Sequence, residues 1–495
     1  MYKVLLPYDL YSVGAIVLAA AALCVTACRG LSSNQRVLLI LLAATVLRFD
    51  AASQWSLNPW DERFHAVVAK HLINDPLMPV LLPEKEGTTT VHDWQTSHIW
   101  LHKPPFALWA MALSMSMFGV NELALRLPSL VFGVAGVWLT YRIGRRLMSD
   151  TEGLVAAGFH AVNGFMISLA SGRRVADHVD AALITIVEAA VWIVVCAESQ
   201  SLGRSTLVGA LTGLAVLTKS MAGLVPLPIF AANLTFASKR RRDHMAAAVG
   251  GAFLVASPWA IYTAIKFPME SALELQYTIA HLTKVIEGHS GHWWFYLRDM
   301  PRYFGEQQYF TLPVMAGLVV RDWRQHRVIV LWWLVPYLIY SAAATKLPNL
   351  VMVAAPAVFL MGAGAQVYLA QATTRRSGWQ RMALFACSTI ALLMPARYAL
   401  EPSGPFERRD RTPARVETYR QLDAKFAGQG ATVYNVPDPI EAMFYSDALT
   451  FRVGFPSNDE ITEASRVGRA VVVLRRLEEV SERQFPATVV VVPAF

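Results

Sequence analysis

An acidic pair opens the first polar stretch in which this apolar chain could do chemistry. Asp61 and Glu62 lie within Trp60–Arg63, at the start of a helical stretch that runs to about Leu72. Neighbouring side chains on a helix point roughly 100° apart, so at most one of the two carboxylates faces a given pocket. A carboxylate in a pocket can act as a general base, whereas the first turn of any helix also favours acids through its dipole. Both interpretations stay open on the sequence alone.

Two lysines stand next to prolines that fix the backbone around them. Lys103 precedes Pro104 and Pro105, and Lys346 stands in Lys346-Leu347-Pro348. Proline restricts its own backbone and that of the preceding residue, so Pro104 and Pro105 hold Lys103 just before the apolar stretch that follows. Such a lysine could serve a functional site, or it could only reach out to lipid headgroups. The sequence does not choose between these two roles.

A third polar stretch separates two apolar runs. Arg173, Arg174, Asp177, His178 and Asp180 all lie within eight positions. The carboxylates and guanidiniums could form a salt-bridged cap at the membrane surface, or they could bind a charged substrate. Ionisable groups this close to hydrocarbon are treated as a functional hypothesis by default.

A fourth polar stretch, at about 266–303, is rich in histidine and lysine. It contains His281, Lys284, His289 and His292. His289 and His292 have the spacing of a metal-binding pair, but paired histidines in a loop are more often exposed to solvent. A divalent metal is therefore left open.

The composition defines the elements that must position these residues. Of 495 residues, 55% are hydrophobic and only 16% are charged, against roughly 25% charged in soluble domains. The apolar residues form runs long enough to cross a bilayer, and a soluble fold would leave many of them bare. The net charge of +8 comes from short clusters between these runs. This is the positive-inside pattern of membrane proteins, so we expect no nucleic-acid partner.

Basic clusters set the expected orientation of about twelve spans, with both chain ends and the polar stretches outside the cytoplasm. The first external loop, 54–122, then contains an apolar helix at 105–118 that cannot cross and should lie along the interface. The clusters are Arg29 with Arg36, Arg142 with Arg145 and Arg146, Lys239–Arg242, Arg321 with Arg324 and Arg327, and Arg375 with Arg376. The expected spans are 11–28, 37–53, 123–141, 153–171, 181–197, 204–219, 221–237, 245–265, 305–320, 328–343, 349–369 and 380–398.

The chain changes character after residue 400, which predicts a membrane domain over 1–400 and a small extracytoplasmic α/β domain over 401–495. Alternating apolar segments at 431–436, 470–474 and 488–492 predict strands. The segments 413–427 and 458–467 predict helices. The tail has neither the GxGxxG nor the GxxxxGK[ST] pattern of a nucleotide-binding loop. The predicted fold class is thus an all-α polytopic membrane protein with a small C-terminal α/β domain.

Several short stretches, in a fixed order over about 50–360, resemble membrane glycosyltransferases of the GT-C class. The chain is most similar to the superfamily of aminoarabinose transferases and protein mannosyltransferases. The stretches are Asp61-Glu62 with Ala69, Lys103–Trp109, Phe118–Glu122 with Arg126-Leu127-Pro128, Thr218-Lys219, Ser257-Pro258-Trp259, and Lys346-Leu347-Pro348.

The resemblance implies roles for these residues. Asp61 corresponds to the general base, and a second-loop aspartate that helps to position the substrate fits Asp180 better than Asp177. The donor phosphate would face Lys103 and Lys346. We keep Glu62 as a further catalytic candidate, and the remaining candidates for substrate binding are Arg173, Arg174, Lys219 and Lys284.

One branch of the superfamily binds a metal through positions that correspond to His102 and His281. Here His102 stands where that branch has a carboxylate, and Ala280 stands where a glutamate usually precedes the histidine. We therefore expect no required cofactor and leave a divalent metal open.

The implied activity is inverting transfer of a sugar from a polyprenyl-phosphate carrier. The acceptor would be lipid A, another envelope glycan or a protein hydroxyl on the periplasmic face of a bacterial inner membrane. The alternatives are a transporter or lipid-linked-sugar flippase, which would carry ionisable residues near the bilayer midplane, and a structural scaffold.

Overall fold

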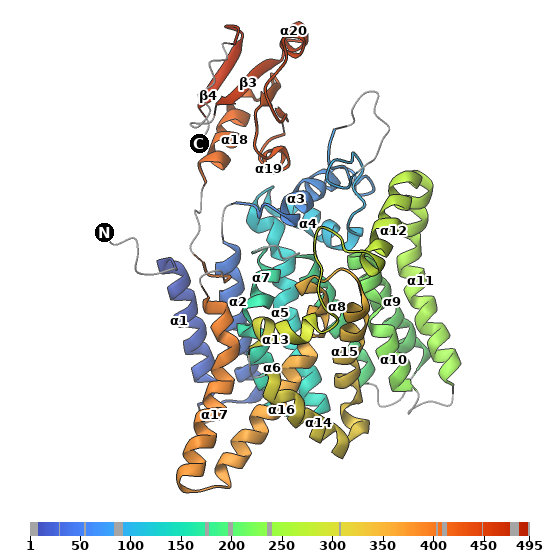
Figure 1. The fold of residues 1–495 in the computed structure, drawn as a ribbon, viewed down its shortest axis with the longest axis vertical. Helices are drawn as coiled ribbons and strands as arrows, with labels where there is room; N and C mark the ends of the chain where they lie inside the picture. Colours follow the sequence, from blue (N-terminus) through green and yellow to red (C-terminus); the bar gives the residue numbers. More distant parts are fainter. Residues whose placement is uncertain are drawn as a thin grey trace.

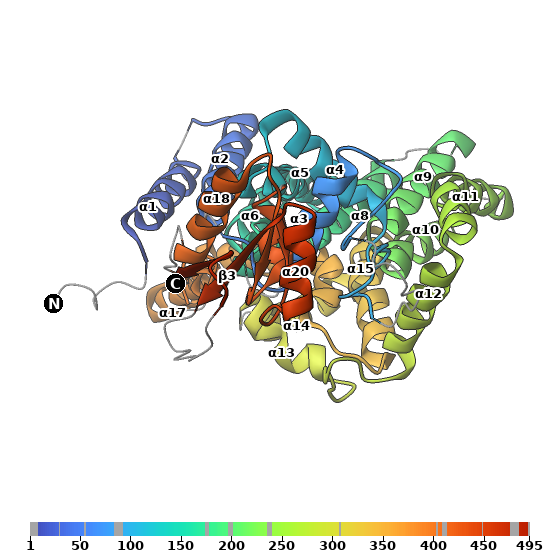
Figure 2. The same cartoon turned by 90° about the horizontal axis from the view of Figure 1, so that it is seen from above.

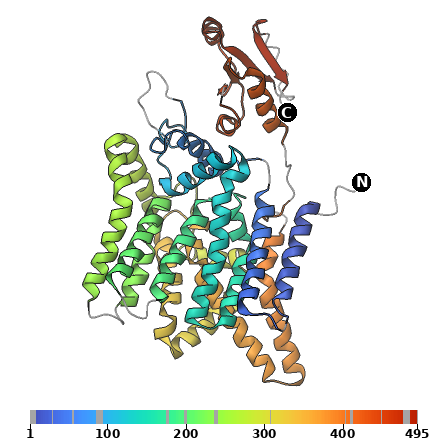
Figure 3. The same cartoon turned by 180° about the vertical axis from the view of Figure 1, so that it is seen from behind.

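The protein is a bundle of long helices with a small sheet domain above one end (Figure 1). The computed structural model describes residues 8–28, 30–53, 56–83, 93–173, 178–196, 201–234, 240–305, 308–401, 404–407, 413–447, 449–475 and 485–493. At one edge of the bundle lies α1, and α11 lies at the other, as the views from the front and from behind agree (Figures 1 and 3). We call the end that carries the sheet domain the site end.

The helices of the bundle correspond to the twelve predicted spans. They are α1 (Leu10–Val25), α2 (Ser33–Ala52), α5 (Glu122–Leu147), α6 (Asp150–Val162), α7 (Gly164–Ala170), α8 (Val179–Cys196), α9 (Leu202–Lys219), α10 (Pro226–Leu234), α11 (Arg241–Lys266), α14 (Gln308–Arg321), α15 (Trp323–Ala342), α16 (Ala355–Thr374) and α17 (Gly378–Arg397). Short 3-10 helices are η1 (Ser220–Leu224), η2 (Pro348–Ala354) and η3 (Tyr398–Leu400).

Five helices among the described residues are long and apolar enough to cross a membrane, and the bent pair α6–α7 would add a sixth. Length and composition thus support a polytopic membrane protein, while the count of twelve spans stays a prediction. The 61° bend between α6 and α7 occurs at Asn163, whose side chain accepts from the Met166 amide and donates to the Tyr303 carbonyl. The Asn163 side chain therefore gives the Met166 amide a partner where the helix is interrupted.

Small residues let α9 and α11 pack with their backbones in contact. A Cβ at Gly209 would lie 1.9 Å from the Ala248 carbonyl oxygen, and one at Gly213 would lie 2.6 Å from that of Ala252. This GxxxG spacing places both glycines on one face of α9, as is common between membrane helices. The pairing fixes the end of α9, which carries Lys219.

The first loop forms a structured cap over the site end, through α3 (Asp61–Leu72) and α4 (Pro105–Phe118). The predicted helix at 105–118 is confirmed, and its place at an interface stays a prediction. Between α3 and α4, Val80 and Ile99 form an antiparallel bridge, and the fully buried Trp100 packs with Phe64 and Leu72. The loop therefore has an apolar core, to which Leu125 at the start of α5 and residues 440 and 444 of the C-terminal segment also contribute.

Two helices that were not predicted occupy the fourth polar stretch. They are α12 (Pro268–Thr283) and α13 (Phe295–Phe304). A proline at the first position of α12 provides a start signal, because its missing N–H is not needed there. The many ionisable side chains of this stretch obscured that signal.

The C-terminal domain is a four-stranded parallel sheet in the order β2-β1-β3-β4, which lies above the bundle close to α3 (Figure 2). The strands predicted at 431–436, 470–474 and 488–492 are confirmed, as are the helices predicted at 413–427 and 458–467. The short β2 and α19 were missed. The elements are α18 (Ala414–Phe426), β1 (Ala431–Tyr434), α19 (Pro439–Phe444), β2 (Leu449–Phe451), α20 (Asn458–Arg466), β3 (Ala470–Arg475) and β4 (Val489–Pro493).

Candidate functional site

The N-terminus of α3 brings an acid and a base together. Asp61 is the first residue of α3, and its Oδ2 lies 3.7 Å from Nζ of Lys103, which is two residues before α4. Both side chains keep partial access to solvent, at 19% for Asp61 and 12% for Lys103. At this distance the carboxylate can accept a proton while the ammonium binds a phosphate beside it.

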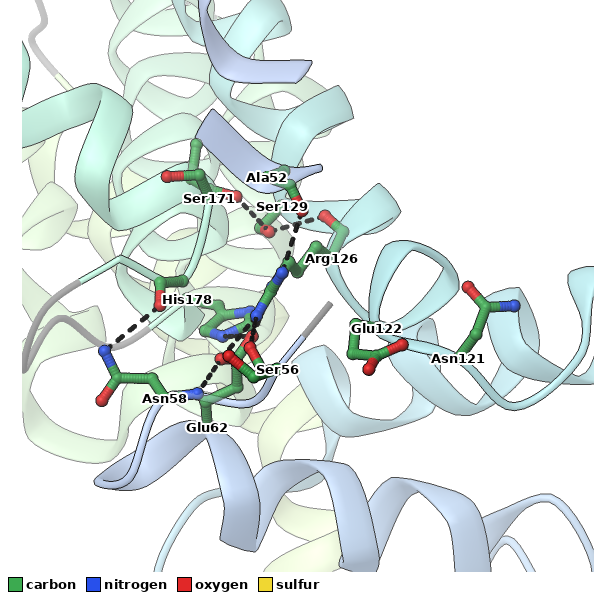
Figure 4. Close-up of polar contacts among 12 residues, drawn as sticks. Ala52, Ser56, Asn58, Glu62, Asn121, Glu122, Arg126, Ser129, Ser171 and His178 are labelled. Atoms are coloured by element: carbon green, nitrogen blue, oxygen red, sulfur yellow. Dashed lines mark hydrogen bonds and ion pairs between the residues drawn. The ribbon is translucent and has the colours of Figure 1, made fainter. Parts of the chain in front are cut away.

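The neighbouring Glu62 lies in a buried cluster instead (Figure 4). The Arg126 guanidinium donates to both Glu62 oxygens, at 2.6 and 2.9 Å, and His178 Nε2 lies 3.0 Å from Oε1. The Asn58 amide donates to Glu62 Oε2 at 2.5 Å. Because Asn58 lies in the turn that leads into α3, this bond fixes the backbone just before Asp61.

Close packing completes the Glu62 cluster. Arg126 also donates to the carbonyls of Ala52 and Ser56, so its guanidinium makes at least four hydrogen bonds in this cluster. Gly172, with φ +65°, lies against the cluster, and a Cβ there would be 2.6 Å from Glu62 Oε1. The cluster therefore needs a glycine at this position and joins the first loop to the second.

The electrostatics of Glu62 are those of a structural anion. Burial raises the pKa of Glu62, but the Arg126 guanidinium and the His178 imidazole outweigh it and hold that pKa well below its usual range. A carboxylate that is fully buried and that accepts from several donors has no access to a substrate proton. We therefore remove Glu62 from our catalytic candidates and treat it as a support of Asp61.

His102 is held by aromatic rings and by an acid from α12. Its Nδ1 lies 3.1 Å from Glu274 Oε1, and its ring stacks on Trp94 with centroids 4.2 Å apart. The Tyr277 ring meets it edge-on at 5.3 Å. These contacts bind α12 to the segment that carries Lys103.

His281 lies near the end of α12, next to the same group. Burial lowers the pKa of His281, and the charges of His102 and Lys103 lower it further. The hydrogen bond to the Tyr277 carbonyl and the charge of Glu287 act in the opposite direction. The backbone carbonyl of His281 accepts from the Thr345 amide at 3.1 Å. Residues 344–346 are thus attached to the Lys103 side of the site.

A second ion pair lies where α8, α9 and η2 meet. Asp180, 2% exposed, has Oδ1 2.5 Å from Lys219 Nζ and accepts from the Asn349 side chain at 2.6 Å on Oδ2. Lys219 ends α9, and Asn349 follows the Lys346-Leu347-Pro348 stretch. Asp180 thus joins two expected positions, its own and Lys219, to the residue that follows the third stretch, and the segment 344–349 connects this pair to His281.

Lys346 has carbonyl partners rather than an acid. Its buried ammonium donates to the carbonyls of Tyr340, Ser341 and Ala343, at the end of α15. Burial lowers the pKa of Lys346, in line with an ammonium whose charge is shielded from water. The side chain thus satisfies backbone groups that the helix end leaves open.

The remaining candidate residues are placed as follows. The buried Arg173 donates to the carbonyls of Pro405 and Glu407, which ties the second loop to the segment after η3. Lys284 is exposed just after α12. Arg174 and Asp177 lie outside the described residues. Arg173 therefore acts in this structure as a link between segments.

The described residues do not fit a metal ion. No group of three or more His, Cys, Asp or Glu side chains in the described ranges gathers closely enough to hold one. Nδ1 of His102 faces Glu274, and Nδ1 of His281 faces the Tyr277 carbonyl, so these nitrogens already have partners. We therefore assign no chemistry to a metal at His102 and His281.

A cavity of about 260 Å³ opens beside His102, between the first loop and α12. Its lining includes four carboxylates, from Asp93, Glu270, Glu274 and Glu287, and the rings of Trp94 and Tyr277. An acidic cavity with aromatic walls repels phosphate and suits neutral or cationic groups.

Three residues that contact the predicted site residues were not predicted from the sequence. They are Arg126 on α5, Glu274 on α12 and Asn349 on η2. Arg126 lies 64 positions from Glu62, and Glu274 lies 172 positions from His102. No local spacing rule reports a pair so far apart in the chain. Arg126 stood in one of the matched stretches, which was the only available signal.

The chain matches the family model described as dolichyl-phosphate-mannose-protein mannosyltransferase over residues 102–297. It is 26% identical over 327 residues to undecaprenyl phosphate-alpha-4-amino-4-deoxy-L-arabinose arabinosyl transferase 1 of Pseudomonas fluorescens, with 61% of this chain and 56% of the relative covered. The undecaprenyl phosphate-alpha-4-amino-4-deoxy-L-arabinose arabinosyl transferase of Pseudomonas aeruginosa is 26% identical over 291 residues. The match covers 54% of this chain and 51% of the relative. The chain thus spans about half the length of the curated relatives it matches.

Solved structures agree on the fold. ArnT from Cupriavidus metallidurans in the apo state has a TM-score of 0.61 at 15% identity and covers 88% of both chains. The Archaeoglobus fulgidus oligosaccharyltransferase in the apo form has a TM-score of 0.56 at 12% identity, over 86% of this chain and 65% of that one. The chain therefore has the fold of these solved structures. By the matching family model and relatives, it is similar to membrane glycosyltransferases of the GT-C class, and among them to the aminoarabinose transferases.

Proposed function

We propose that the protein is a glycosyltransferase that moves a sugar from a polyprenyl-phosphate carrier to an acceptor at the site end of the bundle. The single observation that carries the proposal is the Asp61–Lys103 pair, at 3.7 Å and with access to solvent. The relatives in Pseudomonas act, by name, on an undecaprenyl-phosphate-linked amino sugar, which supports the donor class. The acceptor is an envelope lipid, glycan or protein hydroxyl.

The reaction is a direct displacement at the anomeric carbon. The acceptor oxygen forms the new bond to that carbon as the bond to the phosphate oxygen breaks, and the anomeric configuration inverts. Asp61 accepts the acceptor proton, a step worth about 10²–10⁴-fold in rate. The polyprenyl phosphate leaves with the electron pair of the broken bond.

Lys103 stabilises the leaving phosphate. When the donor binds, the phosphate attracts the Lys103 ammonium away from Asp61, which leaves the carboxylate free to act as the base. A cation close to the departing oxygen lowers the barrier because it is already oriented and needs no reorganisation. Lys219 is a second cation at the site end, and its ammonium is held in place by the ion pair with Asp180. We propose Asp180 as a positioning residue and Lys346 as a support of α15.

The acidic cavity beside His102 takes the part of a substrate that carries no negative charge. Its carboxylates would repel the phosphate, which therefore binds on the Lys103 side. The carrier sugar named for the Pseudomonas relatives bears an amine, and an ammonium would suit the four carboxylates. No metal takes part in any step that we propose.

The site end faces the periplasm of a bacterial inner membrane in this proposal. The basic residues in the last turn of α5 and just after α16 lie at the opposite end, which agrees with the positive-inside rule. The reaction then occurs on the outer face, where no nucleotide is available as a donor.

A transfer assay with purified protein tests the proposal. The protein, in lipid nanodiscs, is incubated with radiolabelled polyprenyl-phosphate sugars and an envelope lipid extract, and the products are separated and identified by mass spectrometry. We expect labelled acceptor from wild type and a loss of at least about 100-fold for Asp61→Asn.

Asp75→Asn is the matched control, because Asp75 is an exposed carboxylate in the same loop and its asparagine keeps the turn bond to Leu77. We expect this variant to retain wild-type rates. Equal rates for Asp61→Asn and Asp75→Asn would remove Asp61 as the base. Transport of intact donor without any product would instead support a flippase.

A further inference from the structure

The C-terminal domain holds α3 through a short helix that is fixed at both of its ends. This helix is α19 (Pro439–Phe444), and side chains of α3 contact its start and its finish. Because α3 begins with Asp61, anything that holds α3 also determines where that carboxylate lies.

At the end of α19, Lys70 meets a set of backbone carbonyls. Its ammonium donates to the carbonyls of Met443, Phe444 and Ser446, at 2.9, 3.2 and 3.0 Å, and lies 2.7 Å from Asp447 Oδ1. Carbonyls at a helix C-terminus have no partner within the helix, and their partial charge favours a cation. Lys70 is only 8% exposed, so these bonds are largely shielded from water.

At the start of α19, Arg63 forms an ion pair with Asp438. Asp438 is also the N-cap of α19, where its Oδ1 accepts from the Glu441 amide at 3.1 Å. Arg63 and Lys70 are seven positions apart, two turns of α3, so they lie on the same helix face. Between them, Phe444 and Ile440 of α19 belong to the same apolar cluster as Val67 of α3.

A third contact joins the domain to the helix that supports Glu62. Glu122, at the start of α5 and 4% exposed, accepts from the Tyr445 hydroxyl at 3.0 Å and lies 3.4 Å from Arg420 of α18. One turn further along α5, Arg126 holds Glu62. The same two elements, α3 of the first loop and α5 of the bundle, thus carry both the support of Asp61 and the attachment of the domain.

We propose that Lys70, Arg63 and Asp438 are positioning residues, through which the C-terminal domain holds α3 so that Asp61 stays at Lys103. This role rests on the proposed function of Asp61 as the base. It assigns the domain a part in the rate of the transfer step rather than in the binding of the donor. Small errors in the placement of a catalytic group are costly, since about 1 Å can reduce the rate 100-fold.

The test replaces Lys70 by methionine, which keeps the length and the apolar stem but removes the ammonium. We expect kcat to fall about 10- to 100-fold while KM for the donor stays within about twofold, because the phosphate contact is kept. Lys70→Arg supplies new donors to the carbonyls and should restore most of the rate. Lys425→Met, at an exposed lysine of α18, is the matched control and should be neutral.

Two further measurements separate this proposal from a loss of folding and from a failure of the proposed function. Asp438→Asn keeps the cap of α19 but removes the charge that pairs with Arg63, and should give a smaller loss of kcat in the same direction. In an Asp61→Asn background, Lys70→Met should cause no further loss, because the residue that it positions is already removed.

Hydrogen–deuterium exchange of the α3 amides reports the same contact without any activity. We expect faster exchange over residues 63–72 in Lys70→Met than in wild type and in Lys425→Met. Unchanged exchange, or an equal loss of rate with and without Asp61, would overturn the positioning role. If wild type transfers no sugar but α3 exchange still rises, the proposed function fails while the contact between the domain and α3 is retained.

Discussion

Two adjacent carboxylates with different surroundings show how this site is built at the scale of single residues. Asp61 meets Lys103 and keeps some access to water, whereas Glu62 is enclosed by Arg126 and His178. The two side chains differ in surroundings because neighbouring residues on a helix point in different directions. Which of the two carboxylates can act as a base therefore depends on the direction of the side chain and not on its chemical type.

Lys103→Met should weaken transfer through the donor phosphate. A hydrogen bond to a charged group contributes about 1.5–3 kcal/mol, so we expect kcat/KM for the donor to fall roughly 10- to 100-fold. Lys103→Arg should recover part of this loss. Lys425→Met, the control, should have the same kcat/KM as wild type. Steady-state kinetics with varied donor measure the effect, and an unaltered kcat/KM in Lys103→Met would exclude the phosphate contact.

Glu62→Gln should destabilise the protein in a pH-dependent way. The variant leaves the Arg126 guanidinium buried without its counter-charge, which typically costs about 3–5 kcal/mol. The folded pKa of Glu62 is lowered, while the unfolded value is about 4.3. The unfolded state thus binds more protons, and the stabilisation by Glu62 is complete above that value and is lost as the pH falls below it.

Thermal unfolding of detergent-purified wild type and Glu62→Gln between pH 7.5 and 3.5 measures this dependence. The difference in melting temperature should be constant near neutral pH and should shrink below about pH 4. Glu463→Gln, at a glutamate that is exposed on α20, provides the comparison. A difference that stays the same at every pH would show that the charge of Glu62 has no such role.

The sequence predicted the separate stretches of the site but not their partners. The stretches stood out because ionisable residues are rare in an apolar chain, and the roles of Asp61, Lys103 and Asp180 came from the family resemblance. Lys219 and Asn349 meet Asp180 only because α9 and η2 end at the same point in space. Such a meeting depends on tertiary packing, which neither composition nor periodicity contains.

At the scale of elements, glycine decides how closely α9 and α11 approach. Gly209→Ala would place a Cβ 1.9 Å from a backbone oxygen of α11, so the two helices must separate. Overpacking of this kind costs about 1–3 kcal/mol, and the melting temperature should fall. Because α9 ends at Lys219, the transfer rate should fall with it.

Gly250→Ala is the control for this prediction. Gly250 lies on α11, and a Cβ there meets no atom within 4 Å. Alanine is the better helix former by about 1 kcal/mol, so the control should be neutral or slightly stabilised. If both variants melt at the wild-type temperature, the close contact between the helices does not exist.

Long apolar elements and the alternating strands were predictable, whereas α12, α13, α19 and β2 were missed. Each expected span corresponds to helical structure, in one case a bent pair of helices, because a long apolar run leaves few other structures available. The six-residue α19 was missed, although Asp438 and Pro439 form a regular helix start. β2 has only three residues, too few for a visible alternation.

At the scale of the whole molecule, the site end should face away from the cytoplasm. Cysteine labelling measures this in a variant without the native Cys24, Cys28, Cys196 and Cys387. Val453→Cys, in the C-terminal domain, should react with a membrane-impermeant maleimide added to spheroplasts. Ser377→Cys, between α16 and α17, should react only after the membrane is opened. The reverse pattern would place the site in the cytoplasm.

The central claim is that a polyprenyl phosphate binds at the site end with its phosphate at Lys103. The most direct test is a cryo-electron microscopy structure of the protein in nanodiscs with added polyprenyl phosphate. The account predicts density for the phosphate within contact distance of Lys103 Nζ, next to Asp61. Density for the phosphate at the far end of the bundle, in the cavity of about 560 Å³ lined by Glu152, Gln325 and Gln371, would contradict it.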